Sequence, residues 1–335
     1  MNAMIKCLPM FCLLLTSLLA NPAFAEDDAA TKAVLITGAS SGIGRNAAER
    51  LAGAGYFVYA GARSADDIAA LNAIDNIMAI RLDVTSQEEI DAALEQIRKG
   101  GRGLWGIVNN AGVNTLDPLI EASEEDLDFL FDVNVYGVFR VTKAFAPLVI
   151  DSGGRIVNIS SISGILSGGL TGYGMYTMSK HAVEAYTDQL AFEMEPLGVR
   201  VIGIEPGSYS TEIGDSRCER MLARQKKYRY YGEAMEPYFD LCRKRLRGDM
   251  PPTAPPPDDV AAAIEDALFA DEPKAHYLVV SAEFEAMITI SKLFEEMLAL
   301  NQDQTFSYTR DELIALMDEE WAILKGEKAR NWDED

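Results

Sequence analysis

The sequence predicts an α/β fold in which a doubly wound parallel sheet carries helices on both faces. Three observations lead to this prediction. From residue 32 onward, short β-branched apolar runs alternate with amphipathic helical patterns, which is the arrangement of βαβ units. A glycine-rich turn follows the first of these runs and opens a helix. The chain has 335 residues, of which 48% are hydrophobic, and this is enough to bury one large core.

The expected strands follow one another at the spacing of βαβ units. Ser86 is the expected N-cap of one helix, because Glu89 stands three residues after it. Right-handed crossovers between the strands produce a doubly wound sheet that binds ligands at the carboxyl ends of its strands. The expected strands span 32–38, 56–63, 77–85, 104–112, 154–161 and 199–207, and helices are expected at 44–55, 86–101, 124–149 and around Tyr176.

The first 25 residues are not expected to belong to this fold. Lys6 precedes an apolar run at 7–20, and Ala23 and Ala25 end the segment in an A-x-A pattern, which is the layout of a cleavable signal peptide. The run is short for a transmembrane span, which needs about 20 apolar residues. The prediction is export to a periplasm or a secretory pathway. The alternatives are a membrane anchor through residues 7–20 and a later start codon.

The chain is strongly acidic, with 52 Asp and Glu against 30 Lys and Arg and a net charge of −22. Recognition of nucleic acid requires a basic face, so nucleic acid is not an expected partner. The same charge disfavours an anionic membrane surface and favours solubility. No set of metal ligands is expected in the site.

The turn between the first strand and the first helix has the sequence TGASSGIG, from Thr37 to Gly44. Its glycines Gly38, Gly42 and Gly44 allow the backbone to turn tightly, and they let a pyrophosphate approach free N–H groups at a helix N-terminus. In this context the turn predicts a dinucleotide site, and the alternative is an ordinary glycine-rich turn. The spacing G-x-x-x-G-x-G differs from the G-x-G-x-x-G of ordinary Rossmann folds.

Six further motifs follow this turn in order, and together they give a resemblance. The chain resembles the short-chain dehydrogenase/reductase family, in its simple subclass with a Rossmann-type domain, over residues 32–211 and more loosely to about 280. The sequence around Tyr176 is similar to the branch of retinol and 17-beta-hydroxysteroid dehydrogenases. The further motifs are LDVT (82–85), NNAG (109–112), VNVYG (133–137), NISS (158–161), YTMSK (176–180) and PGSYST (206–211).

The resemblance implies a nicotinamide cofactor, and the end of the second strand indicates which one. NAD enzymes usually hold the ribose 2′-OH with a carboxylate there, whereas this chain has Arg63, whose guanidinium suits a 2′-phosphate. NADP(H) is therefore predicted, with NAD(H) as the alternative if Arg63 is only solvated. Many NADP-preferring relatives carry a basic residue where Ser40 and Ser41 stand; Arg45 follows the turn.

The resemblance also assigns other residues to the cofactor. Asp83 and Val84 would meet the adenine, and the loop that starts at Pro206 would contact the nicotinamide end. The complete predicted set is Gly38, Ser40, Ser41, Gly42, Ile43, Gly44, Arg63, Asp83, Val84, Asn110, Ala111, Gly112, Tyr176, Lys180, Pro206, Gly207 and Thr211.

Tyr176 and Lys180 lie four residues apart on an expected helix, so their side chains can face the same cleft. Reduction of a carbonyl requires a proton donor for the developing alkoxide, and the reverse reaction requires a base. A tyrosine has an unperturbed pKa of about 10, and a nearby ammonium is expected to stabilise the phenolate and lower that pKa. The motif therefore predicts an acid–base pair, in which Lys180 also holds the nicotinamide ribose by resemblance. Tyr173 is not a candidate, because Thr177 stands four residues after it.

Ser161 is the expected hydrogen-bond donor to the substrate oxygen. The family usually places this serine about 13 residues before the tyrosine, where this chain has Ser163. Ser161 is preferred because NISSISG matches the family's strand end, with Gly164 three residues later, and Ser163 stays as the alternative. Asn134 matches the family's asparagine that holds a water for proton relay through the lysine. The alternative for Asn134 is a polar residue that kinks or caps inside a helix.

The segment at 212–257 is expected to set substrate specificity. Between Arg217 and Arg247 it holds ten Lys and Arg against four Asp and Glu. Its position favours a mobile helical lid with aromatic residues over the substrate, whereas its charges favour a solvated basic face. Cys218 and Cys242 either form a disulfide or stay as free thiols, because spacing alone does not set their geometry.

Two classes of function are compatible with the sequence. The first is an NADP(H)-dependent enzyme that interconverts an alcohol and its ketone or aldehyde on a lipophilic substrate, such as a steroid or retinoid, with Tyr176 as general acid and base. The second is a non-catalytic NADP-binding or interaction protein. The intact set of Ser161, Tyr176 and Lys180 favours the enzyme. The resemblance implies one domain at 32–285 that includes the lid, a C-terminal helical extension at 286–335, and a homo-oligomer, either a dimer or a tetramer.

Overall fold

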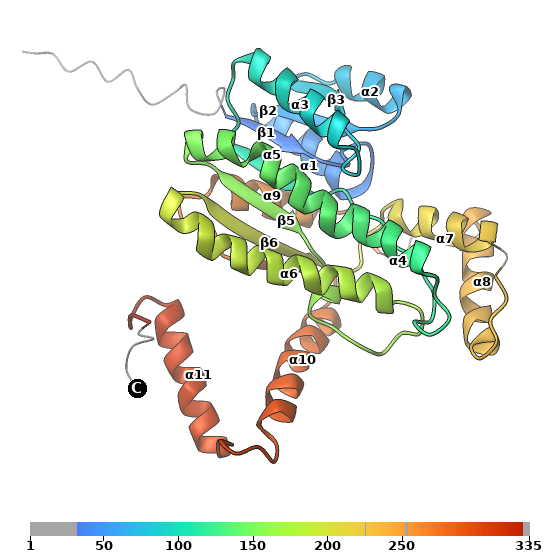
Figure 1. The fold of residues 1–335 in the computed structure, drawn as a ribbon, viewed down its shortest axis with the longest axis vertical. Coiled ribbons are helices and arrows are strands. Elements are labelled where there is room, and N and C mark those ends of the chain that lie inside the picture. Colours follow the sequence, from blue (N-terminus) through green and yellow to red (C-terminus); the bar gives the residue numbers. More distant parts are fainter. Residues whose placement is uncertain (1–31, 225, 252–253, 331–335) are drawn as a thin grey trace, which may run out of the picture.

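The architecture was obtained as a computed structural model, and the structure describes residues 32–224, 226–251 and 254–330. Its centre is a sheet in the strand order β3-β2-β1-β4-β5-β6-β7, and every neighbouring pair is parallel (Figure 1). The order reverses direction between β1 and β4, so the carboxyl ends of these strands form the switch point of a doubly wound fold. The strands are β1 Ala33–Ile36, β2 Phe57–Ala62, β3 Ile77–Arg81, β4 Gly106–Asn109, β5 Arg155–Ile159, β6 Arg200–Pro206 and β7 His276–Val279.

Helices cover both faces of the sheet, so the predicted fold class is confirmed (Figure 1). One face packs against α1 (Gly42–Gly53), α2 (Ala65–Asn72) and α9 (Asp258–Phe269), with Leu51 and Ile264 fully buried in that layer. The other face packs against α3 (Gln87–Gly100), α5 (Gly137–Ser152) and α6 (Gly174–Met194). Strands buried on both faces explain the continuous apolar runs in the sequence, because a parallel sheet exposes neither side to water.

Three elements were not expected from the sequence: α2, α9 and β7. Helix α2 connects β2 to β3, and its N-cap is the hydroxyl of Ser64, which accepts a hydrogen bond from Asp67 N. Strand β7 pairs with β6 in parallel and makes the sheet seven-stranded. Of its four residues only Tyr277 is buried, because the strand lies at the edge of the sheet, so it lacks the continuous apolar character of the central strands.

The helix expected at 124–149 is present from Glu124 to Ser152, but one turn within it is π-helical. Helix α4 (Glu124–Phe131) passes into a π-helical turn, η1 (Asp132–Tyr136), and then into α5. The hydrophobic pattern did not predict this turn. A π-helical turn adds one residue to the helix, and the periodicity of the apolar residues does not indicate where it is added. Such turns are rare and occur frequently at functional sites, and this one contains Asn134. The combined helix, Glu124–Ser152, is the one described segment long and apolar enough to cross a membrane, but 44% of its most apolar window is buried in the protein.

The segment expected to form a lid contains α7 (Ile213–Arg224) and α8 (Gly232–Leu246), which lie beside each other at one end of the sheet (Figure 1), and the name lid is kept for this pair. A disulfide joins Cys218 of α7 to Cys242 of α8, which decides between the two alternatives for these cysteines. Both cysteines are fully buried in a small apolar cluster with Met221 and Met235. The same cluster includes Leu116 from the loop after β4, so it packs the disulfide-linked helix pair against the body of the protein.

Helices α10 (Glu283–Asn301) and α11 (Arg310–Leu324) project from the body of the protein as the two limbs of a V (Figure 1). Only Glu285 and Thr289 of α10 are buried, and no residue of α11 is. Thr309 and Glu312 form a reciprocal capping box at the start of α11. The expected signal segment, 1–25, lies outside the described residues.

Candidate active site

The glycine turn wraps the carboxyl end of β1 and leads into α1. Gly38 has a φ of 63° and Gly42 a φ of 54°, which is the left-handed region that favours glycine. A Cβ on Gly44 would lie 2.3 Å from the Asn110 side-chain nitrogen and 2.4 Å from the Gly38 carbonyl oxygen. Ser41 is the N-cap of α1, and its hydroxyl makes no capping hydrogen bond. The turn thus leaves open backbone and free N–H groups at a helix N-terminus, which fits a pyrophosphate.

Thr37 fastens this turn to β4, a role that the sequence analysis did not assign to it. Its hydroxyl accepts hydrogen bonds from the backbone N–H groups of Asn110 and Ala111, each at 3.0 Å. The Asn110 amide returns two bonds, to the carbonyl oxygens of Thr37 at 2.9 Å and Gly38 at 3.1 Å. Two predicted cofactor segments are therefore locked together before any ligand binds. A threonine that ends an apolar run is too common to signal this role in a sequence.

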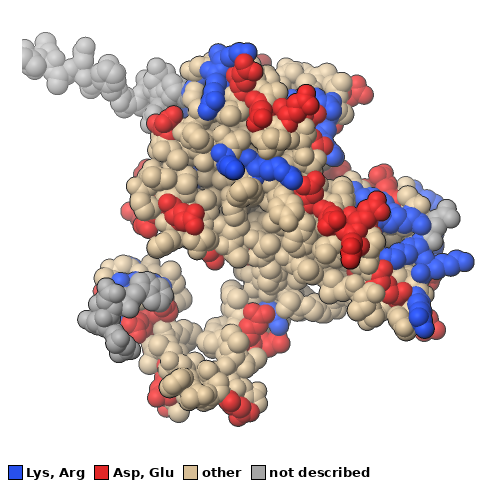
Figure 2. All heavy atoms as spheres, in the orientation of Figure 1, with Lys and Arg blue, Asp and Glu red and all other residues tan. Residues whose placement is uncertain are grey.

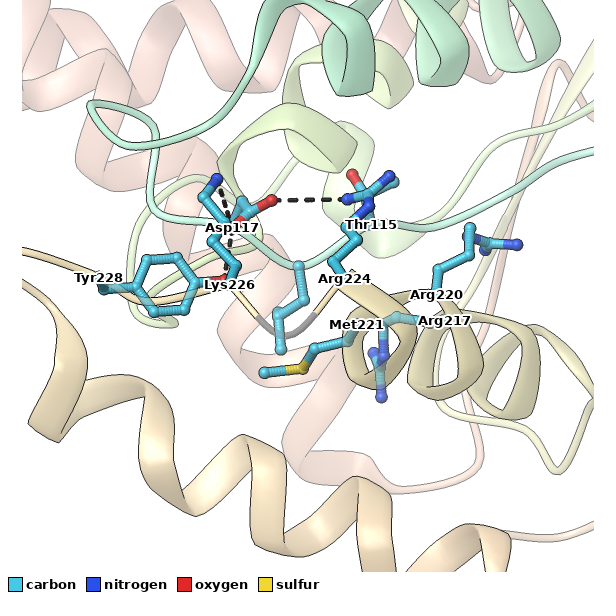
Figure 3. Close-up of a pocket in the computed structure, with 9 residues that line it drawn as sticks. Thr115, Asp117, Arg217, Arg220, Met221, Arg224, Lys226 and Tyr228 are labelled. Carbon is cyan, nitrogen blue, oxygen red and sulfur yellow. Dashed lines mark hydrogen bonds and ion pairs between the residues drawn. The ribbon is translucent and has the colours of Figure 1, made fainter.

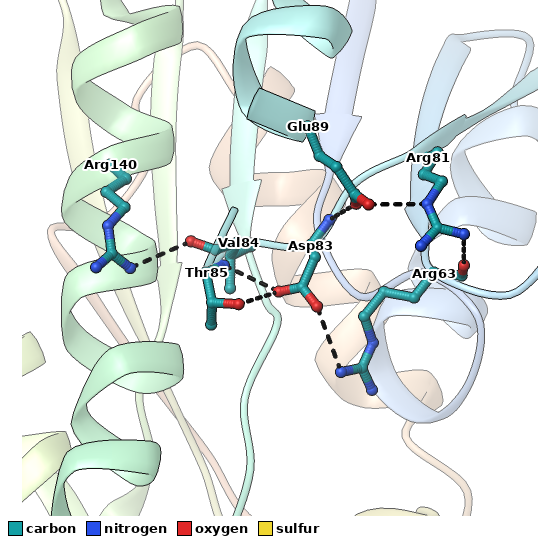
Figure 4. A network of polar contacts seen from close by, with 7 residues as sticks. All are labelled: Arg63, Arg81, Asp83, Val84, Thr85, Glu89 and Arg140. Carbon is teal, nitrogen blue, oxygen red and sulfur yellow. Dashed lines mark hydrogen bonds and ion pairs between the residues drawn. The ribbon is translucent and has the colours of Figure 1, made fainter. Parts of the chain in front are cut away.

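The ends of β2 and β3 bring Arg63 and Asp83 together (Figure 4). An Arg63 guanidinium nitrogen lies 3.8 Å from the Asp83 carboxylate, and the Arg63 side chain is 69% exposed. Arg81 donates to the Arg63 carbonyl oxygen at 2.8 Å and also pairs with Glu89. Burial alone would raise the pKa of Asp83, but hydrogen bonds from Thr85 outweigh it and hold that pKa below its usual value. The guanidinium groups of Arg63 and Arg81 therefore both lie at the end of β2. The sequence analysis did not assign Arg81 to this site.

Tyr176 and Lys180 lie on the first two turns of α6 and point to one side of the helix, as the spacing predicted. The ammonium of Lys180 lies 5.8 Å from the centre of the Tyr176 ring and donates to the Ile159 carbonyl oxygen at 2.8 Å. Gly112 closes the other side, because a Cβ there would lie 3.9 Å from the Lys180 nitrogen. Burial lowers the pKa of Lys180 to about 8, although the carboxylate of Glu184 opposes this shift.

The pKa of Tyr176 does not follow the expectation. Burial raises it to about 12, and the groups that lower it are the Ser161 hydroxyl, by a hydrogen bond, and Arg217, by its charge. The expected lowering by Lys180 is absent, since its ammonium is turned to the Ile159 carbonyl and is itself buried. In the protein alone Tyr176 is therefore a protonated phenol, which suits a proton donor.

Ser161 lies two residues beyond the end of β5, and its hydroxyl is close enough to the Tyr176 phenol to lower the pKa of that phenol. The residue is 8% exposed, and its hydroxyl accepts from Ser163 N at 3.1 Å and donates to the Pro206 carbonyl oxygen at 3.5 Å. Ser163 stands in the short helix η2 (Ile162–Gly164), where its backbone holds Ser161 in place. The structure therefore brings the Ser161 hydroxyl to the phenol, whereas Ser163 supplies a backbone N–H to that hydroxyl.

Asn134 lies in the π-helical turn, and its side chain is fully bonded within the protein. Its amide oxygen accepts from Val113 N at 2.8 Å, and its amide nitrogen donates to Val113 O at 2.9 Å and to the Ser179 hydroxyl at 3.1 Å. These contacts clamp the loop after β4 to α6 beside Lys180. The role of Asn134 in a water relay stays a prediction.

The loop after β6 is held by Glu285 of α10, which the sequence analysis missed. Its carboxylate accepts from the backbone N–H groups of Ser208 at 2.9 Å and Ser281 at 3.3 Å, and a Cβ on Gly207 would lie 2.6 Å from it. The loop also reaches the glycine turn, because a Cβ on Gly42 would lie 3.2 Å from Thr211. Pro206, Gly207 and Thr211 are thus fixed beside the cofactor turn.

Glu184 lies one helical turn after Lys180 on α6, and its carboxylate lies close to Glu205 and His276. The three ligand-type atoms of this group lie within 4.8 Å of one another, and His276 bonds Glu205 at 2.8 Å and Asp188 at 2.9 Å. Burial, followed by the charge of Glu205, raises the pKa of Glu184 to about 7. The positively charged His276 ring is hydrogen-bonded to the carboxylates of Glu205 and Asp188 and offsets part of their charge. The expectation that the active site uses no metal stays a prediction.

We expect His276→Gln to lower the melting temperature in a pH-dependent way. The hydrogen bond to Glu205 raises the pKa of His276 from 6.5 to about 9, although burial opposes it. A pKa raised on folding contributes stability that is complete below the unfolded value and is lost as pH rises through the folded one. The gap between wild type and variant should therefore be wide at about pH 6.5 and narrow by about pH 10.

Scanning calorimetry across this range measures the gap, and the facing groups are Glu184, Asp188 and Glu205. His181→Gln is the matched control, because the His181 ring contacts only the Thr177 carbonyl oxygen among its described partners. A gap for His276→Gln that is constant with pH would contradict the prediction.

The fold and the site together define a dinucleotide-binding oxidoreductase, with a phosphate turn after β1 and a Ser–Tyr–Lys set beyond β5. Comparison with known proteins agrees: the profile of the short chain dehydrogenase family matches residues 32–221. The chain therefore belongs to the short-chain dehydrogenase family. It is an oxidoreductase that acts on alcohol and carbonyl groups with a nicotinamide cofactor.

Individual relatives cover most of the chain. Bovine mitochondrial D-beta-hydroxybutyrate dehydrogenase is 34% identical over 268 residues, which is 75% of this chain and 77% of the relative. Rat retinol dehydrogenase 7 is 36% identical over 222 residues, 64% of this chain and 68% of the relative. A solved short chain dehydrogenase/reductase from Burkholderia phymatum in complex with NAD superimposes with a TM-score of 0.66 at 25% identity, covering 83% of this chain and 98% of that structure.

Proposed function

We propose that this protein is an NADP(H)-dependent enzyme that interconverts an alcohol and its ketone or aldehyde on a lipophilic substrate. The observation that carries the proposal is the grouping of three side chains: the Ser161 hydroxyl acts on the buried Tyr176 phenol, and the Lys180 ammonium lies 5.8 Å from the centre of the Tyr176 ring. A non-catalytic binding protein would not need a buried phenol, serine and ammonium in one cleft, since each costs free energy to bury.

The proposed roles follow from the positions of the side chains. A bound nicotinamide supplies or accepts the hydride. Tyr176 donates its proton to the alkoxide that develops on the substrate oxygen, and in oxidation it removes that proton. Ser161 donates a hydrogen bond to the same oxygen and polarises the carbonyl. Lys180, which reaches the cleft from the next turn of α6, holds the nicotinamide ribose and adds positive charge.

The preference for NADP(H) rests on Arg63. Its exposed guanidinium stands at the end of β2, with no acidic residue at the tip of that strand and with Arg81 beside it. A relative of known structure is bound to NAD, so the alternative, use of NAD(H), needs a direct test.

We expect Arg63→Gln to reduce the ratio of kcat/KM for NADPH over NADH by about 10- to 100-fold, because hydrogen bonds to charged groups contribute about 1.5–3 kcal/mol each. Steady-state kinetics with both cofactors measures the ratio. Arg102→Gln is the matched control, since Arg102 lies over the Phe57 ring at the opposite end of β2. An equal loss with both cofactors would refute the assignment of Arg63 to the 2′-phosphate.

The function itself is tested by oxidation of NADPH and NADH against a panel of ketones and aldehydes of rising chain length. Turnover of at least one compound class, with better kcat/KM for longer chains, supports the proposal. Binding of NADPH without turnover of any member of the panel would favour the non-catalytic alternative.

We also propose that the protein is a homo-oligomer, a dimer or a tetramer. The two projecting helices carry large apolar side chains in water, and an unpartnered apolar surface of this kind marks an interaction site. Acidic residues at the starts of α10 and α11 disfavour an anionic lipid surface as the partner. Light scattering measures the mass in solution. The exposed apolar residues are Phe284, Met287, Ile290, Leu293, Phe294, Leu298, Leu300, Leu316, Met317, Trp321 and Leu324.

Export through the N-terminal segment remains our proposal for localisation, with a membrane anchor at 7–20 as the alternative. N-terminal sequencing of the protein from its native cell fraction distinguishes cleavage after Ala25 from retention of the segment and from a later start.

A further inference from the structure

Four cationic side chains from α7 and the segment that follows it line a pocket (Figure 3). Figure 2 shows Lys and Arg side chains concentrated on this end of the molecule, against an acidic whole. The pocket is lined by Thr115, Leu116, Asp117, Arg217, Arg220, Met221, Arg224, Lys226 and Tyr228.

The cations of the pocket fall into two groups. Arg224 and Lys226 face Asp117, at 3.6 Å and 3.1 Å, and Arg224 also pairs with Asp126. Arg217 and Arg220 have no carboxylate partner among the described residues, and no dashed contact reaches them in Figure 3. The Asp117 carboxylate also accepts a hydrogen bond from the Tyr228 hydroxyl. Its partners are therefore Arg224, Lys226 and Tyr228, and it does not neutralise Arg217 or Arg220.

Arg217 and Arg220 keep donors free for a ligand. Arg217 donates to the Tyr173 hydroxyl and Arg220 donates to the Asn114 carbonyl oxygen at 2.7 Å, but the Nε atom of each is buried and has no partner. Burial, together with the neighbouring guanidinium of Arg224, lowers the pKa of Arg220. Leaving two half-buried guanidinium groups without an anion costs free energy unless a ligand supplies the anion.

A second observation points into the same pocket. Thr115 lines the pocket and is 2% exposed, and its buried hydroxyl has no hydrogen-bond partner among the described residues. A hydroxyl buried in this way is expected to bond something. With Leu116 and Met221 as apolar walls, the pocket offers two charged donors, one hydroxyl and an apolar lining.

The pocket lies at the substrate end of the site. Arg217 bonds Tyr173, the N-cap residue of α6, three residues before Tyr176, and its charge acts on the Tyr176 phenol. The wall of the pocket touches the same place, since Asp117 N donates to the Gly172 carbonyl oxygen at 3.0 Å. Arg63, at the end of β2, is near enough that its charge also acts on Arg220, so the test must separate a substrate anion from the cofactor's phosphates.

We propose that the substrate carries a carboxylate, or an equivalent anionic group, that binds Arg217 and Arg220 of the lid with the Thr115 hydroxyl, while its carbonyl or carbinol carbon lies at Tyr176. This inference rests on the proposed function and narrows its substrate class to lipophilic oxo acids or hydroxy acids. An arginine pair suits a carboxylate because each guanidinium presents parallel N–H donors.

The test compares 4-oxopentanoate and 9-oxodecanoate with their methyl esters, which lack the negative charge and carry one additional methyl group. We expect wild type to prefer the acid in kcat/KM, at one chain length or both, by at least about tenfold. In Arg217→Gln and Arg220→Gln this acid-to-ester ratio should fall by about 10- to 100-fold, the effect of losing hydrogen bonds to a charged group. Arg217→Lys should recover part of it, because lysine restores the charge but not the fork.

Arg243→Gln is the matched control, because it removes an arginine of the lid that pairs with Glu236 and Asp240 at the surface. Its acid-to-ester ratio should equal that of wild type. A fluorescence titration with NADPH shows whether each variant is folded. It also separates the two sources of an anion, because a loss of NADPH affinity that matches the loss of acid turnover would assign both arginines to the cofactor's phosphates and overturn the proposal.

The outcomes separate this inference from the function on which it rests. Turnover of the esters with no preference for the acids leaves the proposed function in place and overturns the inference, as does an equal loss for acid and ester in Arg217→Gln. If no oxo compound is turned over, the proposed function fails. Calorimetric titration with decanoate then still tests the pocket, because binding that Arg217→Gln does not weaken would also overturn the inference.

Discussion

Replacement of Tyr176 by phenylalanine is expected to lower kcat by about 10²- to 10⁴-fold, the usual contribution of a positioned acid–base group. The structure explains the size of the effect. Tyr176 lies beside the Ser161 hydroxyl, and burial keeps its phenol protonated with a pKa of about 12. Phenylalanine retains the ring that fills the cleft and removes the only proton that this position can donate.

The measurement is single-turnover oxidation of NADPH with the best ketone of the panel, together with a fluorescence titration of NADPH. The titration should change little, because the glycine turn and the end of β2 are untouched. Tyr186→Phe is the matched control: it removes a phenol from the same helix, where the ring faces Phe139. Retention of turnover within about tenfold in Tyr176→Phe would contradict the assigned role.

Replacement of Gly44 by alanine is expected to damage both stability and cofactor binding. The added Cβ would lie 2.3 Å from the Asn110 amide nitrogen and 2.4 Å from the Gly38 carbonyl oxygen, and one of these contacts is with backbone. The Asn110 bonds that hold the turn to β4 must then break. Overpacking of this kind costs about 1–3 kcal/mol, and we expect the dissociation constant for NADPH to rise by about 100-fold or more, since the phosphate turn itself moves.

Gly53→Ala provides the control at the far end of the same helix. A Cβ there meets nothing within 4 Å, so alanine should stabilise the helix by about 0.5 kcal/mol, through its higher helix propensity. Urea unfolding and NADPH titration of both variants are the measurements. Equal behaviour of the two variants would show that Gly44 is not under steric constraint.

Much of the site could be predicted because its signals are local. The glycines of the turn, the pair Tyr176 and Lys180 on one helix face, and the strand-to-helix alternation each depend on residues within a few positions of one another. The cap at Ser86 was also predicted, and its hydroxyl accepts from Glu89 N. The second hydrogen bond of a capping box, from Ser86 N to the Glu89 carboxylate, does not form, because that carboxylate accepts from Asp83 N and pairs with Arg81 instead.

Other features could not be predicted, because they join residues far apart in the chain. Glu285 reaches a loop 77 positions away, and the disulfide between Cys218 and Cys242 depends on how two helices pack. The pKa of Tyr176 is a further example. A pairwise argument predicted a lowering by Lys180, whereas burial by the whole cleft dominates and raises the pKa.

The sequence by itself determined the fold class, the phosphate turn and the helix face that presents Tyr176 and Lys180, since periodicity and short spacing specify these. Only the tertiary structure decided that Ser161 faces the phenol, that the lid is closed by a disulfide, and that Arg217 and Arg220 lack a carboxylate partner. The physical reason is that the pairing of charges and the burial of polar groups are set by the elements packed around them, and the order of residues in the chain does not record which elements those are.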